Sequence, residues 1–420
     1  MNNNPNQPRE DDAVLGGQAP PPVTGVTLGG IEGVKSRLAS TVVEARMAAL
    51  AEALKYGKAG LDLAIGALKD ESKPVRRSAY QLLHYRTEPQ VRQALQQYKP
   101  WNLVERLKKY PGYKGNYVST FANRHVVEFE PRVGITNPVS TAYALRCEYE
   151  EDVQEITDKL ATLLKDPKAN QLEALVFGMW NDLYERSSSS LVNALVDAKD
   201  QLTSLKAIFI GDLPYDECEI SWITQSDISP ILAAYPKLEV LQVRGGEGLA
   251  FSPVQHENLE ALIIETGGLS QTTVAQICAL KLPALEHLEL WFGSDNYGGN
   301  CWVDDLTPII KDQVFPNLIY LGLRNSLFSD EIAEAVAYSL LIDSIKVLDL
   351  SMGTLSDRGA EELLNCSGVN TLDILNVSEN FLSDEVIKRL SQLEVQVIAD
   401  EQKDERDQNY LHDRYCSVSE

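Results

Sequence analysis

The sequence has 420 residues with 44% hydrophobic content, which is ordinary for a globular chain and enough for two or three domains. Its net charge of −23 argues against wrapping of the whole chain on nucleic acid, and no apolar run reaches the length of a membrane span. The six cysteines lie far apart without a CxxC pair, which favours a reduced, cytoplasmic protein over a disulfide-linked or zinc-binding one.

The N-terminal segment is predicted to be a disordered leader over residues 1–28. Its start, "MNNNPNQPREDDAVLGGQAPPP", is rich in Pro, Asn, Gly and charge, so it offers little apolar surface to bury. It also lacks the basic and apolar regions of a secretory signal.

Residues 29–108 are predicted to form a small α-solenoid of HEAT-type helical hairpins. Three helical segments with a shared pattern, at 40–54, 70–83 and 87–98, place Arg46, Arg76 and Arg92 at matching positions. We expect these arginines to be structural, with Asp70 as the partner of one of them. The helices resemble HEAT repeats common in cyanobacterial proteins, including subunits of phycobilin lyases.

The same region is basic in an otherwise acidic chain. Residues 29–110 contain fifteen Lys and Arg against eight Asp and Glu. Lys55, Lys58, Lys73 and Arg77 have no role in the repeat pattern, so they are candidates for contact with an acidic surface. A linker is predicted over residues 109–125.

Residues 126–400 contain a repeat of the form L-x-x-L-x-L. It occurs eight times, as LEALVF (172), LKAIFI (205), LEVLQV (238), LEALII (259), LEHLEL (285), LIYLGL (318), IKVLDL (345) and LDILNV (372). The starts lie 21 to 33 residues apart, which is typical of leucine-rich repeats. The pattern predicts a solenoid with parallel strands on the concave face and helices on the convex face.

The repeat also predicts which side chains point where. The first, fourth and sixth positions should point inward, so Leu288 and Leu321 belong to the core and Glu289 should face solvent. Segments such as "LSDRGAEELL" are predicted to be full-length return helices capped by Ser or Asp, which suggests ribonuclease-inhibitor-like repeats. Residues 127–131 and 142–149 should supply capping strands, 395–400 the closing strand, and 401–420 a charged tail.

One insertion, "DECEISWITQSDISP" (216–230), lengthens the repeat that contains it. Its Glu217–Ile223 run and its Ser226, Asp227, Ser229 and Pro230 turn resemble a bacterial leucine-rich-repeat family with no assigned activity. The likeness covers about residues 126–400 and implies architecture without supplying a reaction. The insertion is either a recognition loop or a structural loop, in which Trp222 is partly buried and Ser226 or Asp227 caps the next helix.

No catalytic residues, metal site or cofactor are predicted, because no base, nucleophile and orienting group stand at a recognisable spacing. The histidines form no HExxH pair, and His287 is expected to be a solvated polar residue. Cys278 and Cys366, near the ends of equivalent return helices, are expected to be structural.

The function expected from these features is that of a non-enzymatic protein-interaction scaffold in the cytoplasm, without membrane contact and with nucleic acid disfavoured. The alternative is an accessory or lyase-like chaperone of a phycobilisome or bilin pathway, acting through the HEAT repeats. The partner-binding residues are expected on the concave face and the 216–230 loop: Trp180, Glu217, Glu219, Trp222, Asp227, Glu239, Arg244, Glu260, Glu286, His287, Glu289, Trp291 and Tyr320.

Overall fold

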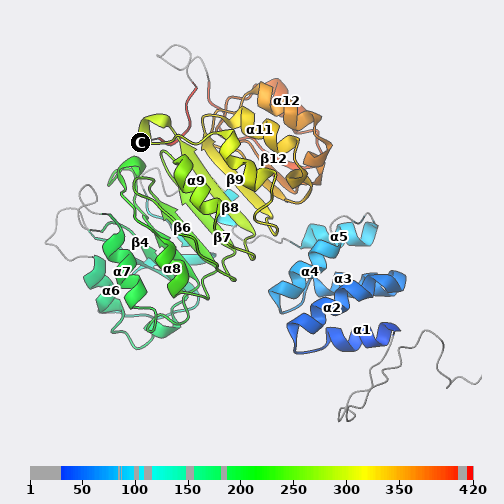
Figure 1. Cartoon of the computed structure of the whole chain (residues 1–420), viewed down its shortest axis with the longest axis horizontal. Helices are drawn as coiled ribbons and strands as arrows, with labels where there is room; N and C mark the ends of the chain where they lie inside the picture. The colour runs from blue at the N-terminus through cyan, green and yellow to red at the C-terminus, as the bar shows by residue number, and fades with distance from the viewer. Residues whose placement is uncertain are drawn as a thin grey trace, which may run out of the picture. The chain divides into compact units, whose positions relative to one another are not determined.

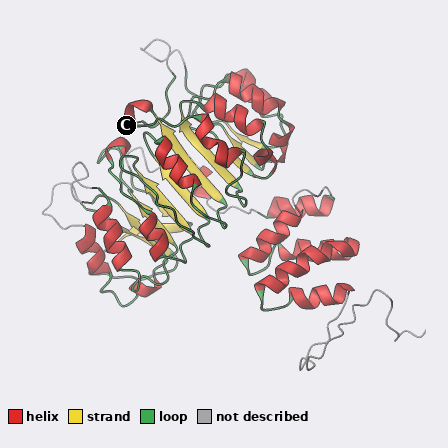
Figure 2. Cartoon of the chain, viewed as in Figure 1, coloured by secondary structure: helices red, strands yellow, loops and turns green. Residues whose placement is uncertain are grey.

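The chain folds into two compact units, Met1–Pro100 and Trp101–Glu420 (Figure 1). The computed structural model describes residues 30–83, 86, 88–98, 104–107, 116–147, 156–180, 187–404 and 414–419. The leader predicted for residues 1–28 lies outside the described residues. Figure 2 shows helices in the first unit and one sheet lined by helices in the second.

The first unit is a run of amphipathic helices packed on their neighbours in the chain. Helix α2 contacts α1, α3 and α4, and α4 contacts α5. Leu50, Val75 and Leu83 are fully buried in the core between them. The helices are α1 (Gly30–Leu38), α2 (Val43–Ala53), α3 (Gly57–Ala67), α4 (Lys73–Leu83) and α5 (Pro89–Gln97), with the 3₁₀ helix η1 (Leu54–Tyr56). Their assignment to the HEAT class stays a prediction.

The matched arginines of this unit have different surroundings. Arg46 is buried, and its Nη2 forms an ion pair with Asp70 Oδ1 at 3.3 Å, as predicted for one of the three. Arg76 donates from Nη1 to the Asp70 carbonyl oxygen at 2.7 Å. Arg92 is exposed. Arg46 and Arg76 therefore both hold the turn that precedes α4.

The second unit is built on a sheet of twelve strands that lie in chain order, β1 to β12. β1 pairs with β2 antiparallel, and every later pair is parallel. The strands are β1 (Thr120–Phe121), β2 (Arg124–Glu128), β3 (Thr141–Leu145), β4 (Ala174–Phe177), β5 (Ala207–Ile210), β6 (Val240–Arg244), β7 (Ala261–Glu265), β8 (His287–Gly293), β9 (Tyr320–Ser326), β10 (Val347–Asp349), β11 (Ile374–Asn376) and β12 (Gln396–Ile398). A parallel sheet in strict chain order is the arrangement that the leucine repeat predicts.

The register of the sheet follows the repeated motif. Leu288 on β8 pairs with Leu262 on β7 and with Leu321 on β9, so equivalent motif positions stand side by side. The fourth position of all eight motifs is fully buried: Leu175, Ile208, Leu241, Leu262, Leu288, Leu321, Leu348 and Leu375. The inward positions are thus confirmed, because stacked units share one continuous core under the sheet.

Helices cover one face of the sheet (Figure 1). They are α6 (Ile156–Leu163), α7 (Ser189–Asp197), α8 (Ser229–Ala234), α9 (Gln271–Cys278), α10 (Thr307–Ile310), α11 (Ser329–Ala337), α12 (Asp357–Asn365) and α13 (Asp384–Leu390). The side chains of Ser356 and Ser383 cap α12 and α13, as predicted, and that of Ser270 caps α9. The N-cap of α11 is Phe328 and no side chain caps it, so the pattern of capped return helices does not extend to α11.

The return segments are shorter and less regular than the sequence predicts. α10 has four residues and α8 has six. Residues 245–260, which join β6 to β7, are all described and contain no helix. A 21-residue unit has too little chain for both a strand and a full return helix, so the expectation of full-length helices throughout is not met.

The boundary between the two units comes earlier than predicted. β1 and the start of β2 lie within the linker expected over residues 109–125. Phe121 is buried, and its ring centroid lies 5.8 Å from that of Phe209. Residues 104–107, expected in the helical domain, also belong to the second unit. Apolar and charged side chains of these segments find partners on the sheet, which the local sequence pattern does not indicate.

The last described residues, 414–419, pack on the repeat unit although the tail is rich in charge. Cys416 and Val418 are buried. Asn325, in a left-handed backbone conformation (φ 53°), accepts from the Val418 N–H at 2.9 Å and donates to the Val418 carbonyl. The Ser417 N–H donates to the Met352 carbonyl at 2.8 Å.

Candidate functional site

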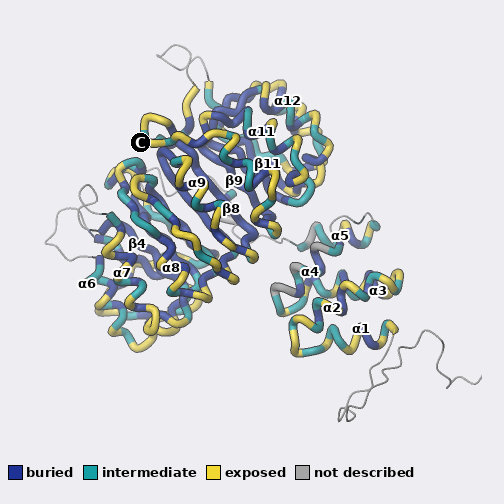
Figure 3. Tube along the Cα trace, viewed as in Figure 1, coloured by how far each residue is buried: buried dark blue, intermediate teal, exposed yellow. Residues whose placement is uncertain are grey.

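The face of the sheet opposite the return helices is the face predicted to be concave, and we refer to it as the concave face. Because side chains alternate along a strand, Leu288 and Leu290 point into the core while Glu289 points to the concave face. Figure 3 shows that the central strands are buried along their length. Several charged side chains on these strands are among the buried residues.

The buried charged residues of the concave face form a candidate site with two parts. The first part joins β6 to β7. The Glu265 carboxylate accepts from Arg244 Nε at 2.9 Å and from Gln242 Nε2 at 3.0 Å. Arg244 also donates from Nη1 to the Leu213 carbonyl at 2.7 Å. Arg244 and Glu265 are fully buried, so this ion pair is shielded from solvent.

The second part is centred on Glu289 of β8. Its Oε1 accepts from Trp291 Nε1 and from Arg324 Nη1, each at 2.8 Å. Arg324 Nε donates to Ser351 Oγ at 2.9 Å and lies 3.6 Å from Asp349 Oδ1. Arg324 therefore bridges two carboxylates on different strands.

Asp349 ends the network on β10. Its Oδ2 accepts from the Tyr320 hydroxyl at 2.9 Å and from Asn376 Nδ2 at 3.0 Å. The His287 ring stacks on Tyr320 with a centroid distance of 3.8 Å. The ionic residues of the two parts, namely Arg244, Glu265, Glu289, Arg324 and Asp349, are called the guanidinium site below.

The guanidinium site holds an arginine from outside the repeats. Arg106 lies on the 3₁₀ helix η2 (Val104–Leu107) and is 7% exposed. It donates from Nε to Glu289 Oε2 at 3.0 Å and from Nη2 to Glu289 Oε1 at 2.5 Å. Nη2 also donates to Glu265 Oε1 at 2.7 Å. One guanidinium group thus joins the two carboxylates at the centre of the face.

The neighbouring residue contributes an apolar contact. Leu107 packs against an apolar cluster on neighbouring strands. The cluster is formed by Tyr320 on β9, Val347 on β10, Ile374 on β11 and Ile319, which directly precedes β9. Residues 104–107, called the docked segment below, therefore contact the concave face through a charged side chain and an adjacent apolar one.

A second part of the chain contacts the site's rim near β5. The Val118 N–H donates to Asp212 Oδ1 at 3.1 Å, and Arg146 Nη2 donates to Asp212 Oδ2 at 2.6 Å. The Arg146 guanidinium lies 4.0 Å from the ring centroid of Tyr117, whose hydroxyl donates to Glu217. Residues 116–118 are therefore tied to the 216–230 loop.

The buried charges perturb several pKa values. Burial would raise the pKa of Glu289, but the guanidinium groups of Arg106 and Arg324 hold it well below its usual range. Burial lowers and the two carboxylates raise the pKa of Arg106, with the net effect upward. Burial raises the pKa of Asp212 to about 6, against the opposing effect of Arg146. The pKa shifts of Glu289 and Arg106 keep these two groups charged at neutral pH, which suits them to recognition by ion pairing.

The structure brings most of the predicted concave residues together but buries them. Arg244, Glu289, Trp291 and Tyr320 are fully buried, and Glu286 and His287 nearly so. The expectations that Glu289 faces solvent and that His287 is solvated are therefore wrong, because the network and the docked segment exclude water. Glu239 and Glu260 are half-buried, while Trp180 is 1% exposed.

The 216–230 loop is structured. Trp222 is 54% exposed, and its Nε1 donates to Glu219 Oε2 at 2.9 Å. Cys218 and Ile220 are buried beneath it, and Ile220–Trp222 forms the 3₁₀ helix η4. Asp227 accepts from the Ser229 N–H at 2.9 Å and from the Ser252 hydroxyl at 2.6 Å. The N-cap of α8 is Ile228 and no side chain caps this helix, so the expectation that Ser226 or Asp227 caps it is not met.

The remaining candidates are four basic residues of the first unit and two cysteines of the second. Lys55 and Lys58 are exposed on the first unit, whereas the side chains of Lys73 and Arg77 lie outside the described part of the chain. Cys278 and Cys366 are half-buried and pack against the repeat core. In the residues that the structure describes, no three His, Cys, Asp or Glu side chains are grouped to hold a metal ion. Among the described helices, none has the length and apolarity needed to cross a membrane.

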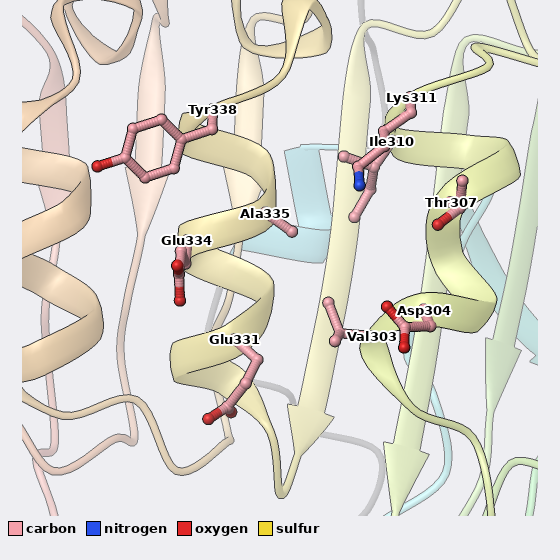
Figure 4. A pocket seen from close by; sticks show the side chains of 9 residues that line it. All are labelled: Val303, Asp304, Thr307, Ile310, Lys311, Glu331, Glu334, Ala335 and Tyr338. Atoms are coloured by element: carbon pink, nitrogen blue, oxygen red, sulfur yellow. The ribbon is translucent and has the colours of Figure 1, made fainter.

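The helix-covered face has a shallow hollow of about 290 Å³ (Figure 4). It lies between the segment from the 3₁₀ helix η6 (Val303–Leu306) to α10 and helix α11. Glu331, Glu334 and Lys311 are among its lining residues, together with Tyr338, which is 77% exposed. Lys311 and Glu334 are exposed and Glu331 is half-buried, so the hollow has no buried ionic network comparable to that of the concave face.

Sequence reasoning missed several members of the network: Arg106, Gln242, Glu265, Arg324, Asp349 and Asn376. Glu265 and Arg324 each stand one place beyond a six-residue motif, as does Arg244, which was predicted, so the seventh motif position could have indicated two of the missed residues. Nothing in the local sequence around Arg106 indicates its partners, which are 159 and 183 residues away.

Comparisons with known proteins support the fold. The chain is similar to a crystal structure of a Bacteroides fragilis protein, a structural genomics target, with 30% identity and a TM-score of 0.58. The match covers 66% of this chain and 77% of that one. An internalin from Listeria monocytogenes has 15% identity and a TM-score of 0.33, covering 61% of this chain and 60% of that one. No protein-family model and no curated protein matches the sequence.

Proposed function

We propose that this chain, which belongs to one family with the Bacteroides fragilis protein, is a non-enzymatic protein-interaction scaffold. Its leucine-rich-repeat unit would bind a segment of a partner protein on the concave face. The observation that carries the proposal is that this face already accepts a polypeptide segment, because Arg106 is bound by Glu265 and Glu289. Solenoid faces present aligned side chains to extended partners in this way.

The 216–230 loop supports the same proposal at the rim of the face. Trp222 exposes more than half of its surface while Ile220 anchors the loop below it. An exposed aromatic residue on a fixed support is a common anchor in interfaces, because its burial excludes water at little cost in side-chain entropy. Glu217 of this loop accepts from the Tyr117 hydroxyl, which ties the loop to the segment before β1.

A site-specific crosslinking experiment tests the proposal. A photoreactive amino acid would be placed at position 239 on the concave face or at 222 on the loop in the full chain. The matched control is position 388, where Lys388 is exposed on α13. We expect one protein to be crosslinked from positions 239 and 222 but not from 388. Crosslinks that are equally abundant from 388, or absent from 239 and 222, would contradict it.

A further inference from the structure

The guanidinium site has an unbalanced charge when Arg106 is left out. The buried carboxylates of Glu265, Glu289 and Asp349 face the guanidinium groups of Arg244 and Arg324. These are three carboxylates and two guanidinium groups, so the formal charges of these five side chains sum to −1. Arg106 supplies the missing positive charge in a place where uncompensated charge is costly.

The geometry selects a guanidinium group over an ammonium group. Arg106 contacts both oxygens of Glu289 through Nε and Nη2, and Nη2 also reaches Glu265. A planar group with several fixed donors can make these three bonds together, whereas a lysine ammonium has a different shape and donor arrangement. The adjacent cluster of Ile319, Tyr320, Val347 and Ile374 accepts an apolar side chain from the next residue.

The residues that fill the site form one turn of a 3₁₀ helix, only four residues long, and not a repeat. Such short turns have little stability of their own. Because the docked segment is tethered to the chain, it occupies the site at the high effective concentration of an intramolecular ligand. A separate peptide that made the same contacts would bind with lower apparent affinity, and it would dissociate and rebind.

We propose that the docked segment is an internal ligand of a site that recognises an arginine followed by an apolar residue in a partner protein, and that the partner displaces it. This inference rests on the proposed function, since it specifies the partner segment that the concave face accepts. In the free protein, the docked segment covers the charged centre of the face. Binding of a partner uncovers that centre and releases residues 104–107.

The probe for this proposal is a fluorescent peptide with the sequence WNLVERLKKY, residues 101–110 of this chain. The receptor is the full chain carrying Arg106→Ala, with Arg358→Ala as the matched control because Arg358 forms an exposed ion pair on α12. We expect the Arg106→Ala chain to bind the peptide at least about tenfold more tightly than the wild type and the control. Replacing arginine by lysine in the peptide should weaken binding about tenfold or more.

A second variant keeps the test decisive if Arg106→Ala folds poorly. Leu107→Ser retains the arginine and weakens the apolar contact, so it should bind the peptide with an affinity between those of the wild type and Arg106→Ala. Hydrogen exchange should be faster at residues 104–107 than at β8, and faster still with excess peptide. The proposal would be overturned if no folded variant binds the peptide, or if wild type and variants bind it equally. Either result would show that the docked segment is a permanent structural element.

The outcomes separate this inference from the proposed function. A partner crosslinked at positions 239 and 222, combined with no peptide binding, would overturn the internal-ligand inference alone. Peptide binding with the expected preference, combined with no crosslinked partner, would uphold the site and overturn the scaffold function.

Discussion

Replacing Glu289 by alanine should destabilise the repeat unit strongly, even though this residue lies at a motif position that the sequence assigns to solvent. The carboxylate accepts hydrogen bonds from Arg106, Arg324 and Trp291, and it is fully buried. Its removal leaves the three guanidinium groups of the network, on Arg106, Arg244 and Arg324, with Glu265 and Asp349 as the remaining carboxylates. The formal charges of Arg106 and the guanidinium site, which sum to zero in the wild type, would then sum to +1.

The magnitude follows from the burial of this network. Removing one partner of a buried ion pair costs about 3–5 kcal/mol, because the other charge is left without compensation. A glutamate on a solvated strand would cost less than about 0.5 kcal/mol. The two descriptions of Glu289 therefore differ by more than about 2 kcal/mol.

Urea unfolding followed by tryptophan fluorescence measures this difference. All five tryptophans lie in the unit Trp101–Glu420, so the signal reports on that unit. Glu361→Ala is the matched control because Glu361 pairs with Arg389 at an exposed position, and it should leave the midpoint almost unchanged. A loss below about 1 kcal/mol for Glu289→Ala would refute the buried-network reasoning.

Other substitutions test separate parts of the structure. Leu288→Ala should cost about 2–5 kcal/mol in the same unfolding assay, because Leu288 is fully buried, and a smaller loss would contradict the register. Trp222→Ala should change the free energy of unfolding by less than about 1 kcal/mol, since the side chain is 54% exposed, yet it should reduce partner crosslinking from position 239. Burial raises the pKa of Asp212 from 3.8 to about 6, so the folded state binds this proton more tightly than the unfolded state. Its contribution to stability should therefore fall as pH rises from about 4 to 6, by at most about 3 kcal/mol, and parallel pH profiles for wild type and Asp212→Asn would contradict this.

The repeat architecture could be predicted because its cause is local and periodic. Leucines at the first, fourth and sixth positions recur eight times, and each strand can bury them only by stacking on the next unit. The structure confirms the eight strands, the buried position of Leu288 and the closing strand β12. The capping roles of Ser356 and Ser383 could also be predicted, because a cap bonds to backbone within a few residues.

The sequence by itself thus determined the strands, their order and the side of each strand that faces the core. Only the tertiary structure decided what covers the other face. Arg106 meets Glu289 across 183 residues, and Asn325 meets Val418 across 93, so no local pattern specifies either contact. A charged residue on a strand is solvated or buried according to what lies on it, and here a segment from outside the repeats turns an expected exposed surface into a buried ionic network.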